Sequence, residues 1–253
     1  MTVLSGTRVL VTGASSGIGF AVAQRCGARG ARVLLTGRAE DRLREAADHV
    51  PGPGARWCVA DLTLSADVAA LLDWATEVGP PDVVVHSAGL GLAADTGTTS
   101  PDRAAEVLTT NLSAPILLTE RFALGMVRRG DGHLVFVTSV AGLLGAPREG
   151  VYAASKAGLH GYARSLRAEL GRAGVRVSTV ATGPVATEFF DRRGERYGRR
   201  LPRPLAVHRV ADAVLTALER DVAEVVLPRW LRIPIALSAV APQTYARLES
   251  RWA

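Results

Sequence analysis

Short apolar stretches rich in valine alternate along the 253-residue chain with longer stretches in which apolar residues recur at helical spacing. The short stretches predict seven strands, at residues 8–12, 32–36, 56–60, 82–86, 133–138, 176–181 and 224–227. The longer stretches predict helices at residues 17–29, 39–49, 65–78, 101–129, 151–171 and 208–220. This alternation is typical of an α/β fold with a doubly wound parallel sheet and helices on both faces. We therefore expect a seven-stranded sheet of this kind in a single domain.

Residues 1–228 are predicted to form this domain, and two segments depart from the alternation. Residues 182–207 are rich in glycine, proline and arginine without a clear period, which predicts a loop or mobile lid. Residues 229–253 form a C-terminal extension whose apolar run, 231–242, is interrupted by Arg232. The run is shorter than the about 20 residues that span a bilayer, so no transmembrane helix is expected. We expect a helix that packs on the body or on a second copy; cover over the substrate and contact with a membrane surface are the alternatives.

The composition is that of an ordinary globular protein, with 48% hydrophobic and 21% charged residues. Two cysteines, Cys26 and Cys58, are too few for a disulfide framework and suit a reducing compartment. The chain starts on a strand pattern and not on a secretory leader, so we expect a cytoplasmic protein. The five histidines show no metal-ligand spacing, and no metal site is expected.

The net charge of +6 is compatible with an anionic partner, but its distribution argues against nucleic acid. Basic residues are scattered, aromatic residues make up 5%, and no nucleic-acid recognition motif occurs, so no nucleic-acid partner is expected. One local cluster falls in the predicted lid, at Arg192, Arg193, Arg196, Arg199, Arg200 and Arg203. Such runs usually form a solvated face, and the alternative is that they receive an anionic substrate.

A glycine-rich segment, residues 12–19, joins the first predicted strand to the first predicted helix. Glycine permits a tight turn at this point, and the backbone N–H groups of a helix N-terminus attract phosphate. A tight turn that binds nothing is the alternative. Because a strand precedes the segment and a helix follows it, the pattern predicts a dinucleotide pyrophosphate site. Its residues are Gly13, Ser15, Ser16, Gly17, Ile18 and Gly19.

Arg38 stands just past the second predicted strand, about 20 residues beyond the glycine-rich segment. An NAD site places a carboxylate there to bind the ribose 2′-hydroxyl, whereas an arginine suits the 2′-phosphate of NADP. Glu40 or Asp41 turning inward is the alternative. The sequence therefore favours NADP(H) as the cofactor.

Two further turns are predicted to complete the cofactor site. Asp61, followed by Leu62, ends the third strand and could accept a hydrogen bond from the adenine amino group; a polar residue that merely opens a loop is the alternative. Ser87, Ala88 and Gly89 follow the fourth strand, where small residues leave room for the nicotinamide ribose.

Lys156 is the only lysine among 30 basic residues, and Tyr152 lies four positions before it in a predicted helix. Residues at i and i+4 share one helix face. A phenol with a pKa of about 10 is a weak base at neutral pH, and a nearby ammonium favours the phenolate. The pair predicts that Tyr152 is an acid/base whose pKa Lys156 lowers; an ordinary exposed pair is the alternative.

Two more polar residues are candidates for the catalytic site. Ser139 ends the fifth strand and could stabilise a developing oxyanion; a strand-end serine without such a role is the alternative, and Thr138 and Ser155 compete with it. Asn111 is the only asparagine and falls in the middle of a long predicted helix, where its side chain is unfavourable. It is predicted to bend the helix and hold a water near Lys156; a helix break without a catalytic role is the alternative.

Together these residues resemble the short-chain dehydrogenase/reductase family in its single-domain form, from residue 5 to about residue 227. The resemblance implies a Rossmann-type fold, a homo-oligomer and a catalytic tetrad. It also implies that Thr187 lies near the nicotinamide carboxamide, and Gly183, Val185 and Thr187 are predicted to bind the cofactor. The matching motifs are Thr12-Gly13-x-x-x-Gly17-x-Gly19, Asp61, Ala88-Gly89, the tetrad of Asn111, Ser139, Tyr152 and Lys156, and then Gly183 and Thr187.

The chain departs from the family pattern at two positions and in its C-terminal end. Ser87 stands where the family often has asparagine, so a bond between strands is expected to be lost. Thr182 stands where the family often has proline, so the loop that follows is expected to be less rigid. The apolar C-terminal end resembles members that handle hydrophobic substrates more than acyl-carrier-protein reductases.

The sequence therefore predicts an NADP(H)-dependent oxidoreductase that interconverts a ketone or aldehyde and an alcohol. The substrate is expected to be a small-to-medium apolar molecule. A dinucleotide-binding sensor or scaffold without turnover is the alternative, and an intact tetrad argues against it. An isomerase or dehydratase on the same scaffold is less favoured, since too few residues lie beyond the sheet for an added substrate domain.

Overall fold

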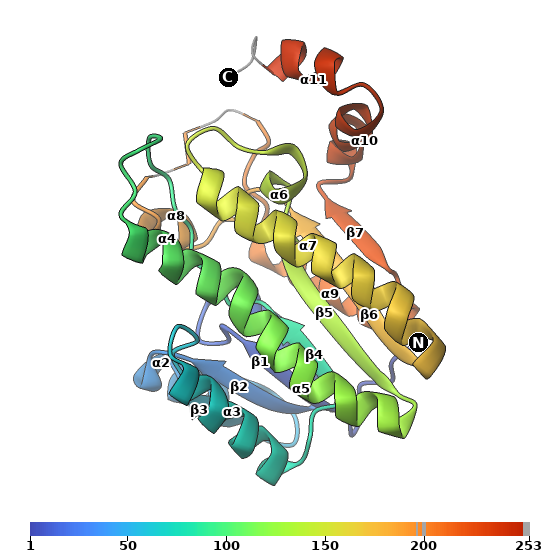
Figure 1. The fold of residues 1–253 in the computed structure, drawn as a ribbon. Coiled ribbons are helices and arrows are strands. Elements are labelled where there is room, and N and C mark those ends of the chain that lie inside the picture. Colours follow the sequence, from blue (N-terminus) through green and yellow to red (C-terminus); the bar gives the residue numbers. More distant parts are fainter. Residues whose placement is uncertain (196, 199–200, 250–253) are drawn as a thin grey trace.

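All seven predicted strands are present in the computed structural model, which describes residues 1–195, 197–198 and 201–249. They form one parallel sheet in the order β3-β2-β1-β4-β5-β6-β7. The strands are β1 (Arg8–Thr12), β2 (Arg32–Gly37), β3 (Arg56–Val59), β4 (Val83–His86), β5 (Gly132–Ser139), β6 (Val175–Thr182) and β7 (Glu224–Leu227). The expected single-domain, doubly wound fold is thus confirmed (Figure 1).

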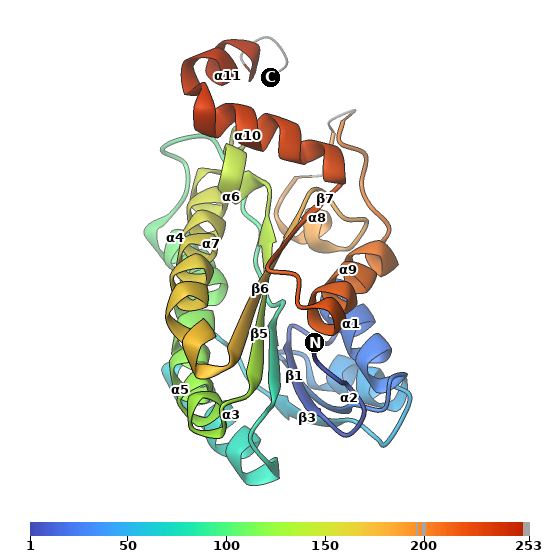
Figure 2. The ribbon, with the colours of Figure 1, turned by 90° about the vertical axis from the view of Figure 1, so that its right-hand side faces the viewer.

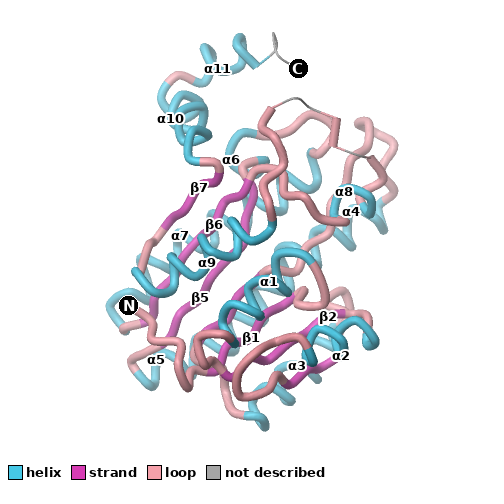
Figure 3. The backbone as a smooth tube through the Cα atoms, turned by 180° about the vertical axis from the view of Figure 1, so that it is seen from behind, coloured by secondary structure: helices cyan, strands magenta, loops and turns pink. Residues whose placement is uncertain are grey.

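Helices cover both faces of the sheet, as the alternation predicted. One face carries α1 (Gly17–Gly27), α2 (Glu40–Asp48) and α9 (Val207–Arg220), which Figure 3 shows in front. The other carries α3 (Ser65–Val78), α5 (Ala114–Arg129) and α7 (Gly150–Leu170), in front in Figure 1. Beyond the carboxyl ends of the strands lie α4 (Pro101–Leu108), α6 (Ala141–Leu144), α8 (Phe189–Arg192), α10 (Arg232–Val240) and α11 (Pro242–Glu249).

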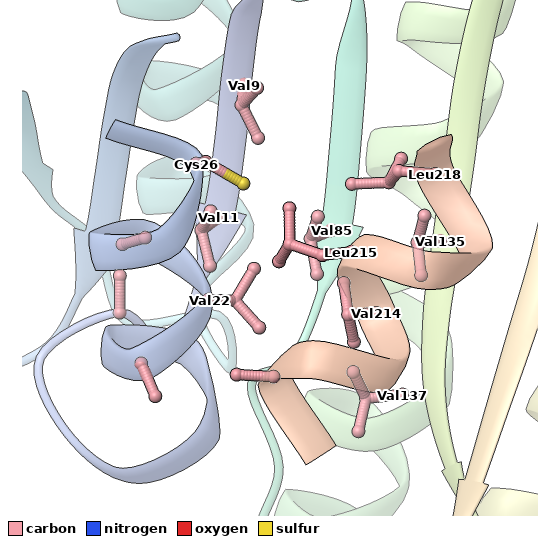
Figure 4. Packing of buried hydrophobic residues seen from close by; sticks show 14 of the residues in the cluster. Val9, Val11, Val22, Cys26, Val85, Val135, Val137, Val214, Leu215 and Leu218 are labelled. Carbon is pink, nitrogen blue, oxygen red and sulfur yellow. The ribbon is translucent and has the colours of Figure 1, made fainter. Parts of the chain in front are cut away.

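Two apolar cores form because successive side chains of a strand point to opposite faces. On β1, Val9 and Val11 join the core under α1 and α9, whereas Leu10 joins the core under α3, α5 and α7. Figure 4 shows the first core, in which the strand valines meet Val22 of α1 and Val214 of α9. Since both faces are buried, the strands read as continuous apolar stretches.

The order of the strands places one crevice in the molecule. The sheet is wound outward in both directions from β1, which pairs with β2 on one side and β4 on the other. In open α/β sheets, ligands bind outside the carboxyl ends of the strands at this switch point. Predicted site residues lie on the turns after β1, β4 and β6 and at the end of β5.

The region 101–129 is not one regular helix. A π-helical turn, Thr109–Ser113, separates α4 from α5 and has Asn111 at its centre. The regular α-helical hydrogen-bonding pattern is therefore interrupted at Asn111, where the sequence predicted a bend. The helix α6 was not predicted, because four residues are too short to show a period.

The described part of residues 182–207, predicted to be a loop or mobile lid, contains local structure that the sequence did not indicate. The segment contains α8, and an isolated parallel bridge between Val185 and Leu205 ties its two ends together. Adjacent aromatic residues, Phe189 and Phe190, give α8 an apolar face that packs on the body. The apolar run of 231–242 is also interrupted, since α10 ends at Val240 and Pro242 begins α11.

Candidate active site

A cavity of about 600 Å³ opens at the carboxyl ends of the strands. Every residue predicted to bind the cofactor lines it, from Gly13 at the first turn to Thr187 near α8. Ser139, Tyr152 and Lys156 line it as well, whereas Asn111 is not among its described lining residues. The structure therefore brings the sequence candidates to one place.

The glycine-rich turn after β1 is packed too tightly for larger residues. Gly13 adopts φ +67°, and a Cβ there would lie 2.7 Å from the Cα of Ala88 in the turn after β4. Thr12 fixes the same junction, because its Oγ1 accepts hydrogen bonds of 3.1 Å from the N–H groups of Ser87 and Ala88. The N-cap residue of α1, Ser16, makes no side-chain capping bond. The turn and the helix N-terminus thus form an anion cradle that fits a pyrophosphate.

The end of the cavity next to β2 and β3 is lined by two arginines and by Asp61, which is paired with one of them. Arg38 and Arg42 both line it, and Arg38 Nη1 lies 3.9 Å from Asp61 and 3.6 Å from Glu106. These distances in a half-exposed side chain describe weak, screened attractions that leave the guanidinium able to bind another anion. Arg42 was not predicted, although its position one helical turn after Arg38 was a usable signal.

The acidic alternatives for a ribose 2′-hydroxyl site do not face the cavity. Neither Glu40 nor Asp41 is among its described lining residues. Asp41 Oδ1 instead accepts a hydrogen bond from Arg44 at 2.7 Å, on the exposed side of α2. No carboxylate therefore takes the place that an NAD-specific site would require at the end of β2.

Asp61 is already committed to its own turn. Its Oδ1 accepts hydrogen bonds from the Thr63 N–H at 2.9 Å and from the Thr63 hydroxyl at 2.7 Å. Burial raises the pKa of Asp61, but these bonds and the charge of Arg38 outweigh it and hold that pKa below the ordinary value. An ionised Asp61 keeps Oδ2 as an acceptor, and both Asp61 and Leu62 line the cavity.

Three polar side chains meet at the other end of the cavity. Ser139 ends β5, where its Oγ accepts a bond from the Ala141 N–H at 3.2 Å and donates to the Thr182 carbonyl at 3.4 Å. Tyr152 and Lys156 come from the first turns of α7, and all three residues are buried. Lys156 Nζ donates to the Val137 carbonyl at 3.2 Å and lies 6.0 Å from the centre of the Tyr152 ring.

Lys156 is not among the groups that shift the pKa of Tyr152 in this structure, so the lowering expected from Lys156 and an oxidised nicotinamide stays a prediction. Burial is the largest effect and raises the pKa of Tyr152 to about 12. A hydrogen bond with Ser139 and the charge of Arg193 lower it, while the charge of Glu149 raises it. Burial also lowers the pKa of Lys156 to about 8. The spacing of the pair predicted proximity correctly, but it carried no information on desolvation.

Asn111 holds the π turn against the turn after β4. Its Oδ1 accepts from the Leu90 N–H at 2.7 Å, while its Nδ2 donates to the Leu90 carbonyl at 2.9 Å and to Ser155 Oγ at 3.0 Å. Both amide hydrogens are therefore used inside the protein, so the prediction that this side chain holds a water finds no support in the geometry. Ser155, which also donates to the Tyr152 carbonyl, is a support of α7 and not a competitor of Ser139.

The segment after β6 closes the cavity from the opposite side. The Gly183 N–H donates to the Leu227 carbonyl at 2.7 Å, and Val185 pairs with Leu205. Thr187 packs on the glycine-rich turn, where a Cβ at Gly17 would lie 3.3 Å from its Cγ2. Gly183, Val185 and Thr187, which were predicted to bind the cofactor, therefore all line the cavity on this side.

Both departures from the family pattern have a structural outcome. Ser87 Oγ is buried without a hydrogen-bond partner among the described residues, in line with the expected loss of a bond. At the second position, Thr182 Oγ1 donates to the Gly183 carbonyl at 2.8 Å, and the Thr182 carbonyl accepts from the Val140 N–H. The start of the loop is thus held by local bonds in place of a proline ring.

Within the segment predicted to be a loop or mobile lid, residues 186–195, which we call the lid, lie over Tyr152. Phe189 packs on Tyr152 with ring centres 5.6 Å apart. Arg193, predicted as part of a solvated cluster, is instead buried and pairs with Glu149 at 2.5 Å, while its guanidinium lies 4.7 Å from the Phe190 ring centre. Arg196, Arg199 and Arg200 of that cluster lie outside the described residues, and Arg203 is exposed.

The lid also requires a residue without a side chain below it. A Cβ at Gly91 would lie 2.7 Å from the Phe189 ring and 2.8 Å from Arg193 Cβ. Arg148, which is not part of the lid, donates hydrogen bonds to Asp95 and to Glu195 at the end of the lid, each at 2.9 Å. The lid is therefore closed over Tyr152 by an apolar contact and by ion pairs. Long-range pairings of this kind carry no local sequence signal.

Comparison with known proteins agrees with this geometry. The family model described as short chain dehydrogenase matches residues 7–198. An uncharacterized oxidoreductase of Staphylococcus epidermidis is 32% identical over 83% of this chain and 89% of its own length. The ketoacyl reductase HetN of a Nostoc species is 29% identical over 100% of this chain and 91% of its length. A short-chain dehydrogenase from Sphingobium yanoikuyae, solved in complex with NADPH, is 27% identical with a TM-score of 0.83 over 92% of this chain and 94% of that one. The chain belongs to the short-chain dehydrogenase/reductase family of oxidoreductases, which bind a nicotinamide dinucleotide.

Proposed function

We propose that the protein is an NADP(H)-dependent oxidoreductase that interconverts a ketone or aldehyde and an alcohol. One observation carries the proposal: Ser139, Tyr152 and Lys156 are buried together in a cavity that continues into an anion cradle. The relative solved with NADPH and the ketoacyl reductase among the similar proteins support the cofactor and the class of reaction.

Two arginines and the lack of an inward carboxylate on α2 support NADP(H) over NAD(H). In the proposed complex Arg38 binds the 2′-phosphate, with Arg42 on the same edge of the cavity. The glycine-rich turn holds the pyrophosphate, and Asp61 and Leu62 meet the adenine. Gly183, Val185 and Thr187 lie against the nicotinamide, and the turn of Ser87, Ala88 and Gly89 lies against its ribose.

When bound, the nicotinamide supplies or accepts a hydride. The chain positions the carbonyl and manages the proton. In the reducing direction the Ser139 hydroxyl donates a hydrogen bond to the carbonyl oxygen, which favours the developing negative charge. Tyr152 gives its phenolic proton to that same oxygen as the alcohol forms, and a pKa of about 12 keeps the phenol protonated at neutral pH. In the oxidising direction the same proton transfer runs in reverse, so Tyr152 must accept the proton and its pKa must be lower.

Lys156 and Asn111 have supporting roles in the proposal. A Cβ at Gly89 would lie 3.3 Å from Lys156 Nζ, so the absence of a side chain there leaves room for a ribose hydroxyl beside the ammonium. A cation at that point favours the phenolate that Tyr152 leaves after it gives up its proton. We propose that Asn111 positions these groups through the turn at Leu90 and through Ser155 under α7.

The lining beyond Tyr152 supports an apolar substrate. It includes Leu144 and Ala146 near α6, Phe189 of the lid, and Leu231 from the C-terminal extension. Glu149, an acid in this lining, is paired with Arg193. The family resemblance also leads us to propose a homo-oligomer, for which the exposed leucines of α5, Leu117 and Leu124, offer an apolar surface.

Titration of the purified protein with NADPH and with NADH, followed by nucleotide fluorescence, tests the proposal. The same samples are then mixed with a panel of apolar ketones and aldehydes, and cofactor oxidation is recorded at 340 nm. We expect tighter binding of NADPH and oxidation with at least one panel member. Binding without turnover across a broad panel would favour the sensor alternative, and no binding of either nucleotide would refute the proposal.

A further inference from the structure

The C-terminal segment, residues 229–248, exposes an apolar helix face. None of the residues of α10 is buried, and Ile233 and Val240 are 73% and 82% exposed. Together with the exposed Ala236 they follow the i, i+3, i+7 spacing of one helix face. Trp230, at 48% exposure, precedes this face in the short 3₁₀ helix Arg229–Leu231. Large aliphatic side chains at such exposure are uncommon on a free surface unless they contact something.

The charge of the segment has one sign. No aspartate or glutamate occurs between residues 225 and 248, whereas Arg229, Arg232 and Arg247 fall within that range. Arg229 and Arg232 are exposed, and no ion pair joins either to an acid in the part of the chain that the structure describes. Glu224 of β7 shares a shallow hollow with Arg232, and its carboxylate lies 3.6 Å from His160. The face is therefore apolar with a basic border.

The segment projects from the body beside the mouth of the active-site cavity. Figures 1 and 2 show α10 and α11 beyond the carboxyl end of the sheet, at the same end of the molecule as α6. Leu231 and Tyr245 of the segment line the cavity itself. The opposite side of α10 packs on the body through Ile235. An occupant of the exposed face would thus lie next to the apolar end of the cavity.

We propose that this face docks on the surface of an anionic lipid membrane, with Trp230, Ile233 and Val240 in the interfacial layer and Arg229 and Arg232 at the headgroups. An apolar helix face with a basic border is the pattern that binds such surfaces, and the basic border selects lipid headgroups over a second copy with the same positive charge. Within the described residues, no helix is both long and apolar enough to cross a bilayer, so the contact is peripheral. This inference is independent of the proposed reaction.

Co-flotation of the full-length protein with lipid vesicles tests the proposal. Vesicles of phosphatidylcholine alone are compared with anionic vesicles that contain phosphatidylcholine and phosphatidylglycerol at a ratio of about 7:3. We expect binding to the mixed vesicles. Ile233→Ser/Val240→Ser should lower the partition coefficient by about ten-fold or more, since two aliphatic side chains no longer leave water. Arg229→Ser/Arg232→Ser should lower it by about five-fold for each arginine on the mixed vesicles only.

Matched controls separate docking from general stickiness of a basic protein. Val3→Ser/Leu64→Ser removes two aliphatic side chains of 75% and 54% exposure elsewhere, and Arg172→Ser/Arg220→Ser makes the same change in net charge at the opposite end of the sheet. Both controls should bind like the unchanged protein. An equal loss in controls and test variants would overturn the proposal. Absence of binding to the mixed vesicles would also overturn it. If Ile233→Ser/Val240→Ser then changes the oligomeric state in sedimentation velocity, the face is an interface between copies.

Discussion

Replacing Arg38 by glutamine removes the charge that we propose for the 2′-phosphate and keeps a side chain of similar reach. A charge-assisted hydrogen bond contributes about 1.5–3 kcal/mol. The Arg38 side chain is 51% exposed and is shared with Asp61 and Glu106, so the lower part of that range applies. About 1.5–2 kcal/mol corresponds to a loss of NADPH affinity of about 10- to 30-fold.

NADH lacks the 2′-phosphate, so its affinity should change by less than about three-fold in the same variant. Isothermal titration of each nucleotide into Arg38→Gln and into the unchanged protein gives both numbers. Arg44→Gln is the control, because Arg44 lies on the exposed side of α2 and pairs with Asp41. Equal losses of NADPH and NADH affinity, or an equal effect of Arg44→Gln, would refute the assignment of Arg38 to the phosphate.

Three further predictions rest on other parts of the structure. Gly13→Ala should lower the free energy of unfolding in urea and abolish nucleotide binding, because its Cβ would lie 2.7 Å from Ala88 Cα. Gly130→Ala is the control, since Gly130 has the same φ of +67° with open space around it, and the variant should lose only about 1 kcal/mol of unfolding free energy through backbone strain. Glu149→Gln leaves Arg193 buried without its anion, so trypsin should cleave the lid faster and turnover should fall, while NADPH affinity is kept. Asp95→Asn alters an exposed ion pair and should change neither the cleavage rate nor turnover. An unchanged cleavage rate in Glu149→Gln would rule out a role of this ion pair in closing the lid. Burial lowers the pKa of His86 to about 3, so the unfolded chain binds more protons than the folded chain between about pH 6.5 and 3. The free energy of unfolding should therefore fall as the pH falls through that window, and urea unfolding at pH 7 and pH 5 should show the drop. The drop should be smaller in His86→Gln, and an identical drop in that variant would contradict the prediction.

The strand pattern could be predicted because each strand satisfies one local rule over its whole length. The alternation of Val9, Leu10 and Val11 between two cores requires apolar residues on both faces, and a continuous apolar stretch is what the sequence displays. The glycine-rich turn, Arg38 and the pair of Tyr152 and Lys156 were likewise local patterns that the fold then brought together.

Features that depend on contacts between distant segments could not be predicted. Arg193 and Glu149 are 44 positions apart, and nothing near either residue indicates that they form a buried ion pair. Nothing in the sequence near Gly91 indicates that the Phe189 ring packs against it and excludes a side chain there. The pKa of Tyr152 depends on how completely the folded chain excludes water, and residue spacing does not encode that quantity.

The same distinction applies to Asn111. Its rarity and its mid-helix position indicated a break in the helix, and the π turn is there. Which groups its amide would bond depended on where the turn after β4 and the first turns of α7 would lie, and these are set by the tertiary fold.

The central claim is that the Tyr152 hydroxyl transfers the proton in a carbonyl–alcohol interconversion. Single-turnover oxidation of bound NADPH by an active carbonyl substrate should be about 100- to 10,000-fold slower in Tyr152→Phe, with nucleotide affinity unchanged, since only the acid is lost. Tyr162→Phe is the matched control on the same helix, because its hydroxyl donates to the exposed Glu120 at 2.7 Å and should be dispensable. A single-turnover rate in Tyr152→Phe within about three-fold of the unchanged protein would contradict the claim.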